Sequence, residues 1–138
     1  MGLKYLIDTN VVSEPMRPEP REVVLRNLRR HDKEIAISSV VWHELRFGME
    51  RLPHSRRRAA IERYLEEVVL RTMPILEYDR AAAEWHASER ARLSARGKTP
   101  PFADGQTAAV AYVHGLIVVT FNGVDFKRFD GIRVLSWL

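Results

Sequence analysis

A series of short apolar, β-branched runs, separated by segments with helical periodicity, most constrains what this chain can fold into. Three runs are clear and two are weaker: residues 3–7, 34–37 and 116–120, then 73–76 and 132–135. Strands that alternate with helices in this way favour a parallel sheet covered by helices on both faces. The 138 residues contain no repeat, low-complexity tract or linker, so a single domain over 1–138 is expected.

Six helical segments are predicted between these strands, at about 9–16, 20–31, 38–52, 55–71, 79–96 and 102–114. The Ser38-Ser39 pair is a good start for the third helix, and Gly97 and Gly115 are good stops for the last two. The helix at 102–114 is apolar nearly all round, which predicts that it is buried.

Two of these helices have a clear apolar stripe. In the third helix Val41, Leu45, Gly48 and Leu52 recur at helical spacing. In the fourth helix the residues expected to face inward are Ile61, Tyr64, Leu65 and Val68.

Composition restricts the classes of function that fit. The chain has no cysteine, which excludes disulfides and thiolate metal sites and fits a reducing cytoplasm. Charged and polar residues interrupt the first ten positions, so no secretory signal peptide is expected, and no apolar stretch is long enough to span a membrane. The formal net charge of +4 suits a polyanionic partner such as nucleic acid, although a solvated helix surface explains it equally well.

Four carboxylates stand in unusual surroundings, and each also has an ordinary explanation. Asp8 follows the first strand and can cap the next helix, while Asp104 opens the most apolar helix and can cap it. Glu44 lies beside the apolar stripe of the third helix and can extend outward to solvent or pair with Arg46 or Arg51. Asp125 can occupy the third position of a short turn capped by Asn122.

Taken together, the four suggest a cation site. If the first strand and strand 116–120 are neighbours, Asp8, Glu44, Asp104 and Asp125 can converge on one edge of the sheet. Two carboxylates about 4 Å apart repel each other by about 4 kcal/mol at an effective dielectric constant of 20, unless a proton or a cation neutralises them. Oxygen ligands without sulfur or histidine select a hard cation, Mg²⁺ or Mn²⁺, which suits phosphodiester hydrolysis.

At these residues the chain resembles the PIN-domain ribonucleases, specifically the VapC-type toxins and their FitB-like relatives. The matching segments run in order from residue 3 to about 126: Leu6-Ile7-Asp8-Thr9-Asn10, Ser38-Ser39 through Glu44-Leu45 to Gly48, Asp104 through Ala111, and Thr120-Phe121-Asn122 with Asp125-Phe126. The segment from Asp8 to Pro15 is similar to the FitB branch. One departure is Phe121, where many relatives have arginine, so a basic group near the site is lost.

This resemblance implies a three-layer α/β/α sandwich around a five-stranded parallel sheet. It implies that Asp8, Glu44, Asp104 and Asp125 bind one or two Mg²⁺ ions, and that Thr9, Asn10, Thr120 and Asn122 give polar support. The implied activity is that of a Mg²⁺-dependent endoribonuclease, the toxin of a toxin–antitoxin pair. The implied partners are RNA, a second copy of the chain in a homodimer and a small antitoxin, with Trp42, Phe47, Met49 and Leu52 as candidates for its groove.

Two alternatives are weighed against this interpretation. A PIN-like domain that binds RNA or protein without catalysis would not need the full acidic set. A haloacid-dehalogenase phosphatase needs a second aspartate at position 10, which is Asn10 here, and a receiver domain needs an acidic pair beside Asp8. Neither of these two Mg²⁺-using folds fits the chain.

Overall fold

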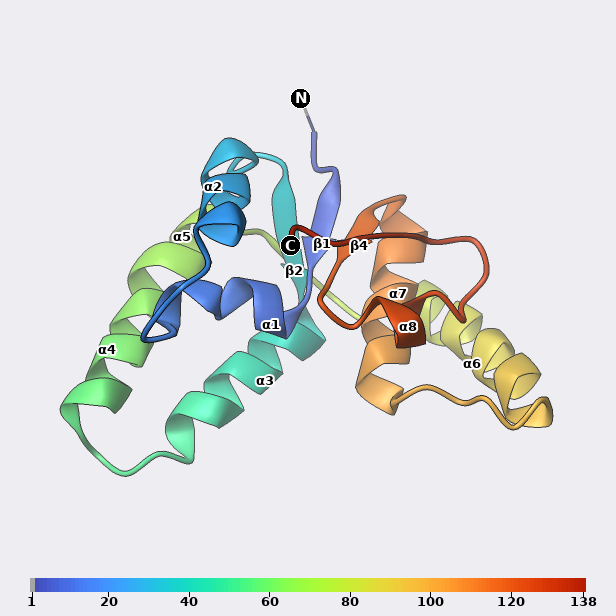
Figure 1. Cartoon of the computed structure of the whole chain (residues 1–138). Helices are drawn as coiled ribbons and strands as arrows, with labels where there is room; N and C mark the ends of the chain where they lie inside the picture. Colours follow the sequence, from blue (N-terminus) through green and yellow to red (C-terminus); the bar gives the residue numbers. More distant parts are fainter. Residues whose placement is uncertain (1) are drawn as a thin grey trace.

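The computed structural model describes residues 2–138 and confirms the five-stranded parallel sheet with helices on both faces (Figure 1). Its strands lie in the order β3-β2-β1-β4-β5. Their bounds are Tyr5–Ile7 for β1, Ile35–Ser38 for β2, Ile75–Leu76 for β3, Ile117–Val119 for β4 and Arg133–Leu135 for β5. All five apolar runs of the sequence therefore form strands.

The strand order places a crevice at the carboxyl end of β1. From β1 the chain first adds β2 and β3 on one side of the sheet and later adds β4 and β5 on the other. Ligands of open parallel sheets bind outside the strand ends at such a reversal of strand order. Ile7 pairs with Val119, so the residues that follow them, Asp8 and Thr120, leave the sheet side by side.

The helices agree with the predicted segments, with the first one broken into two pieces. The helical elements are α1 (Thr9–Val12), η1 (Glu14–Met16), α2 (Glu22–Arg30), α3 (Ser39–Glu50), α4 (Arg56–Tyr64), η2 (Leu65–Val69), α5 (Leu70–Thr72), α6 (Arg80–Ala95), α7 (Phe102–His114) and α8 (Gly123–Phe126). The short 3₁₀ element η1 contains Pro15, whose nitrogen has no hydrogen to continue an α-helical ladder. The predicted helix over 9–16 is therefore interrupted at Ser13.

The expected inward stripe of the fourth helix is wrong at Val68. Residues 65–69 form a π-helical turn, η2, and Val69 is fully buried while Val68 is 42% exposed. A π turn inserts an extra residue into the helix, so the buried face moves one position along the sequence.

Two other burial predictions also need correction. The buried residues of α3 are Val41, Leu45 and Met49. Leu52, which was expected to continue this stripe, lies beyond the end of the helix at Glu50. The α7 helix is buried through its middle, but its last turn leaves Tyr112 and Val113 exposed.

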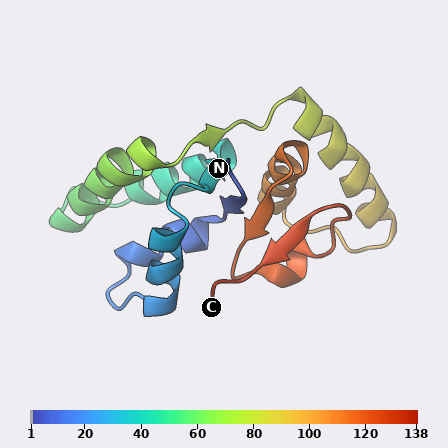
Figure 2. The same ribbon diagram turned by 90° about the horizontal axis from the view of Figure 1, so that it is seen from above.

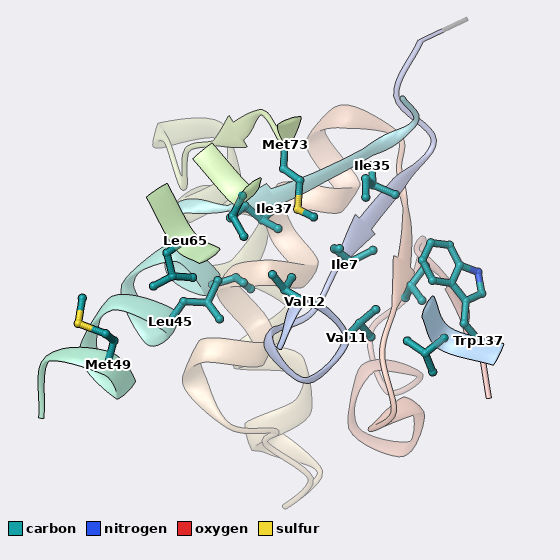
Figure 3. Packing of buried hydrophobic residues seen from close by; sticks show 14 residues of the cluster. Ile7, Val11, Val12, Ile35, Ile37, Leu45, Met49, Leu65, Met73 and Trp137 are labelled. Atoms are coloured by element: carbon teal, nitrogen blue, oxygen red, sulfur yellow. The ribbon is translucent and has the colours of Figure 1, made fainter. Parts of the chain in front are cut away.

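Two hydrophobic clusters hold the layers together. One packs α1 to α5 on the sheet and includes Ile7, Ile37 and Leu65 (Figure 3). The other packs α6 to α8 on the opposite side and includes Leu6, Val118 and Phe126. Seen from above, the two groups of helices lie on either side of the strands (Figure 2). Within residues 2–138, no helix combines the length and the apolar character that crossing a membrane requires.

Candidate active site

The four carboxylates singled out in the sequence are carried by elements that gather at the carboxyl edge of the sheet. Asp8 follows β1, Glu44 lies in α3, Asp104 lies in the first turn of α7 and Asp125 lies in α8. Figure 1 shows α1, α3 and α8 meeting at the end of the sheet opposite the N-terminus. The predicted neighbourhood of the first strand and strand 116–120 is confirmed by the pairing of β1 with β4.

Asp8 is both a helix cap and a member of the acidic group. Its Oδ1 accepts a hydrogen bond from the backbone N–H of Thr9 at 2.9 Å, and its Oδ2 accepts one from the Thr120 hydroxyl at 2.8 Å. Burial raises the pKa of Asp8 above its ordinary value, and these two hydrogen bonds oppose that rise by favouring the carboxylate. The carboxylate is thus held in one orientation at the crevice.

Glu44 does not form the ion pairs that its sequence neighbours offer. Arg46 pairs with Glu50 and Glu66, and Arg51 lies over the ring of Phe47. Partial burial raises the pKa of Glu44, and the negative charge of Asp8 raises it further. The explanation of Glu44 as a glutamate paired with its own helix is therefore wrong.

Asp104 does not cap its helix either. The cap position of α7 is Pro101, which offers no side-chain hydrogen bond, and Asp104 lies three residues further on. Burial raises the pKa of Asp104 to about 6, with additional contributions from the charges of Asp8, Asp125 and Glu44. The charges of the other three carboxylates therefore all act on Asp104.

Asn122 serves the carboxylates rather than the helix that it precedes. Its side chain makes no capping hydrogen bond to α8. Instead its Nδ2 donates to Asp125 Oδ2 at 2.9 Å and to Asp104 Oδ2 at 3.4 Å. The backbone N–H of Asn122 donates to the Thr120 hydroxyl, which in turn donates to Asp8. One short segment after β4 thus connects three of the four acidic residues.

The residues present suit a hard divalent cation. In the part of the chain that the structure describes, no three acidic or histidine side chains lie close enough to hold one ion as they stand. Burial nevertheless raises the pKa of Asp104, and the negative charges of Asp8, Asp125 and Glu44 raise it further. The hydroxyl of Thr9 lies close enough to Glu44 to lower the pKa of that carboxyl group. The Thr9 oxygen is nevertheless buried without a hydrogen-bond partner. Excess carboxylate charge and an unsatisfied oxygen are what a cation would relieve.

A buried hydroxyl pair that the sequence prediction missed joins the helices of Glu44 and Asp104. The Oγ atoms of Ser38 and Thr107 are 3.1 Å apart, and both side chains are buried. Ser38 also accepts from the backbone N–H of Val41, which confirms it as the cap of α3. The signal in the sequence was a lone threonine within the apolar segment of α7.

The loop that carries Phe121 still has a guanidinium beside it. Phe121 packs against the core, its N–H approaches Asn10 Oδ1 at 3.5 Å, and the Arg21 Cζ lies 4.5 Å from its ring centroid. Arg21 is held by the fully buried Glu14, which binds its side chain and its backbone N–H. Asn10 therefore contacts the loop that carries Phe121.

Comparison with known proteins agrees with this architecture. A model of the PIN domain family matches residues 5–132. The chain is 36% identical to Toxin FitB of Neisseria gonorrhoeae, over 96% of this chain and 97% of that protein. It is 33% identical to the tRNA(fMet)-specific endonuclease VapC of Shigella flexneri, over 98% of both chains.

Solved structures give the same relationship in three dimensions. The FitAcB complex of Neisseria gonorrhoeae has a chain that superposes with a TM-score of 0.87 at 33% identity, covering 96% of this chain and 97% of that one. A chain of the DNA-bound VapBC complex of Salmonella typhimurium superposes with a TM-score of 0.86 at 30% identity, covering 99% of both chains. The five-stranded sheet, the ordered motifs and these similarities over nearly the full length establish that this chain belongs to the PIN-domain family, in the group that contains the VapC and FitB toxins.

Proposed function

We propose that this chain is a Mg²⁺-dependent endoribonuclease that cleaves RNA phosphodiester bonds and acts in the cytoplasm as the toxin of a toxin–antitoxin pair. The observation that carries the proposal is the grouping of four carboxylates at the carboxyl end of β1, where burial and then the charges of Asp8, Asp125 and Glu44 raise the pKa of Asp104. The names of the relatives, a toxin and a tRNA-specific endonuclease, support RNA as the substrate.

Asp8, Glu44 and Asp104 would hold the principal Mg²⁺, and Asp125 would complete the pocket or hold a second ion. Mn²⁺ satisfies the same all-oxygen ligand set. When bound, such an ion supplies Lewis-acid activation of water and of the phosphoryl oxygens. The positive formal charge of the whole chain, +4, favours the approach of the RNA backbone to an otherwise acidic pocket.

The chain's own polar residues orient this pocket. Thr120 fixes the Asp8 carboxylate through its hydroxyl, and Asn122 holds Asp125 and Asp104 through its amide. Such outer contacts set the direction of the carboxylate lone pairs and reduce the freedom that ligand binding would otherwise remove. Thr9, whose hydroxyl lowers the pKa of Glu44, would support that carboxylate.

The test is RNA cleavage by the purified protein with added Mg²⁺, with EDTA and with Asp8→Asn. We expect cleavage only by the parent protein with Mg²⁺, and sequencing of the 5′ ends of the fragments would identify the cut sites. Asp8→Asn removes one charge and keeps the side-chain shape, so its thermal unfolding should stay close to that of the parent. Full activity in Asp8→Asn or in EDTA would contradict the mechanism.

The same experiment distinguishes the non-catalytic alternative. A PIN-like domain that only binds RNA would give a stable complex and no Mg²⁺-dependent cleavage across a broad panel of transcripts. The four coupled carboxylates favour catalysis, because a binding role alone gives no reason to concentrate negative charge against a polyanion.

The antitoxin partner is the second part of the proposal. The relatives solved as FitAcB and VapBC are complexes of this kind by name. Among the groove candidates on or near α3, Met49 is 1% exposed and packs in the core, but it also lines the hollow that contains Glu44. Trp42 is partly buried against the core, whereas Phe47 is 59% exposed.

Two adjoining hollows offer a better path for an antitoxin segment. One has a volume of about 160 Å³ and the next about 250 Å³, and both are lined by Met16 and Ile61. The first also reaches Glu44, so a segment lying over Met16 and Ile61 could place a basic side chain against the acidic pocket. Charge complementarity would then block the site to RNA.

Co-purification from the native operon tests this part. A small protein should elute with the chain and suppress its RNA cleavage. Ile61→Glu places a charge in the shared hollow and should release that protein while the Asp8-dependent cleavage persists. Purification of the chain alone from its operon would count against the antitoxin.

A further inference from the structure

A guanidinium of α6 without an acidic partner lies beside the first turn of α7, the turn that carries Asp104. The Arg90 Cζ lies 5.0 Å from the ring centroid of Phe102, the first residue of that helix. Two other arginines of α6 are paired with glutamates, Arg80 with Glu84 and Arg92 with Glu89. Among residues 2–138, Arg90 forms no such pair, so its charge is available to a ligand.

Phe102 is an exposed aromatic ring on a rigid support. Half of its surface is exposed, although it is large and apolar. Beneath it lies the buried His86, whose ring centroid is 4.9 Å from that of Phe102 and whose Nδ1 is hydrogen-bonded to the Tyr78 hydroxyl at 2.9 Å. Because His86 is fixed in this way, the Phe102 ring has a rigid neighbour while half of its surface stays exposed.

Arg90 also lines a groove along α6. It has a volume of about 340 Å³ and is lined by Arg90 with Ala87, Ala91, Ser94 and Thr99. It thus combines one free cation with two hydroxyl groups, which are typical ligands of a phosphate or a ribose. Figure 1 shows the segment after α6 returning to the start of α7, the helix that carries Asp104.

We propose that this groove binds the single-stranded stretch of RNA next to the scissile bond. Arg90, with Ser94 and Thr99, contacts the sugar-phosphate backbone, and one base stacks on the Phe102–Arg90 pair. Phe102 and Asp104 both lie in the first turn of α7, on different sides of the helix, so a strand with its phosphate at Asp104 would reach the ring by passing around the end of the helix. Aromatic rings and guanidinium planes are the surfaces on which unpaired bases stack. The inference rests on the proposed ribonuclease function and adds where its substrate lies.

Binding can be measured apart from cleavage in the Asp8→Asn background. The probe is a fluorescein-labelled single-stranded RNA of mixed sequence, titrated by fluorescence anisotropy at several salt concentrations. Phe102→Leu should weaken binding about fivefold or more, and Phe102→Tyr should restore it because it keeps the ring. Arg90→Gln should lower the slope of log Kd against log salt by about 0.7, the value for one phosphate contact on a single strand.

Arg30→Gln is the matched control for charge, since Arg30 is an exposed arginine near the end of α2. It should leave the salt slope nearly unchanged. If Phe102→Leu and Arg90→Gln bind within twofold of their Asp8→Asn parent while the native chain cleaves RNA, the groove is not the binding site, although the proposed function stands. If the native chain neither binds nor cleaves RNA, both proposals fall. A change in solution mass on Phe102→Leu would identify this face as a contact between copies and would also overturn the inference.

Discussion

The hydroxyl of Thr120 donates a hydrogen bond to Oδ2 of Asp8 at 2.8 Å, although the two residues are 112 positions apart in the sequence. Both follow neighbouring parallel strands, β1 and β4, at the same level of the sheet. The same hydroxyl accepts a hydrogen bond from the backbone N–H of Asn122. Thr120 therefore links the orientation of Asp8 to the turn that carries Asn122 and Asp125.

Thr120→Val should reduce RNA cleavage about 10- to 100-fold, the range expected when an outer contact of a metal ligand is lost. Valine keeps the buried shape but cannot orient Asp8. The Mg²⁺ concentration for half-maximal cleavage should rise as well. Thr120→Ser keeps the hydroxyl and should remain close to the parent, while thermal unfolding checks that both variants are folded. Unchanged cleavage by the valine variant would show that Asp8 needs no such support.

The pKa of Asp104 predicts how the stability of the metal-free protein depends on pH. Its value of about 6 in the folded state exceeds the ordinary value of 3.8, so the folded chain keeps a proton that the unfolded chain has lost. The free energy of unfolding in EDTA should therefore fall as pH rises from about 4 to about 6 and then level off. In Asp104→Asn the free energy of unfolding should no longer fall between about pH 4 and about pH 6. The variant should therefore become more stable relative to the parent as the pH rises through this range.

The same pKa makes the effect of Mg²⁺ dependent on pH. Protons and the cation compete for Asp104, so added Mg²⁺ should raise the melting temperature much more at pH 7.5 than at pH 5. Melting curves at both pH values, with and without Mg²⁺, provide the measurement. If the melting temperatures of the parent and of Asp104→Asn change with pH and with Mg²⁺ in the same way, both the predicted pH dependence of stability and the predicted pH dependence of the Mg²⁺ effect are contradicted.

Glu14 should contribute strongly to stability although it lies outside the acidic pocket. It is fully buried, it binds Arg17 and Arg21, and these contacts lower its pKa to about 2. Glu14→Gln should destabilise the fold by about 3 kcal/mol in denaturant titrations, the lower end for a broken buried pair, since both arginines are partly exposed.

The difference between Glu14→Gln and the parent should depend on pH. A lowered pKa in the folded state adds stability above about pH 4.5, and this stability is lost as pH falls toward 2. Glu22→Gln breaks an exposed pair with Arg29 and is the control, with an expected cost of less than about 1 kcal/mol. Equal effects of the two substitutions at neutral pH would show that burial of Glu14 adds nothing.

Gly105 allows α6 and α7 to approach each other. A Cβ at this position would lie 2.2 Å from Nε2 of the buried His86, so Gly105→Ala should destabilise the fold by about 1–3 kcal/mol. Gly48→Ala in α3 meets no atom within 4 Å and should stabilise by up to about 1 kcal/mol. In a His86→Ala background the penalty at Gly105 should disappear. Equal responses at the two glycines in thermal unfolding would contradict the close packing.

The sequence predicted the local elements well because periodicity and terminal residues are local signals. The five apolar runs became strands, Ser38 caps α3, and Gly115 ends α7 in the left-handed conformation that glycine adopts without strain. The π turn at η2 was not predictable from the period of apolar residues, since Val68 and Val69 are equally apolar. Packing against the sheet decided which of them is buried.

The sequence by itself determined that four carboxylates follow strand ends or lie near helix starts, and their order along the chain carried the family resemblance. It left each of them with a second explanation, because capping and ion pairing within a helix depend only on neighbours in the sequence. Tertiary structure decided between these explanations: Arg46 turns to Glu50 and Glu66, and Pro101 takes the cap position in place of Asp104. The reason is physical. Electrostatic coupling among Asp8, Glu44, Asp104 and Asp125 depends on distances through space, and only the pairing of β1 with β4 and the packing of α3 and α7 beside them set those distances.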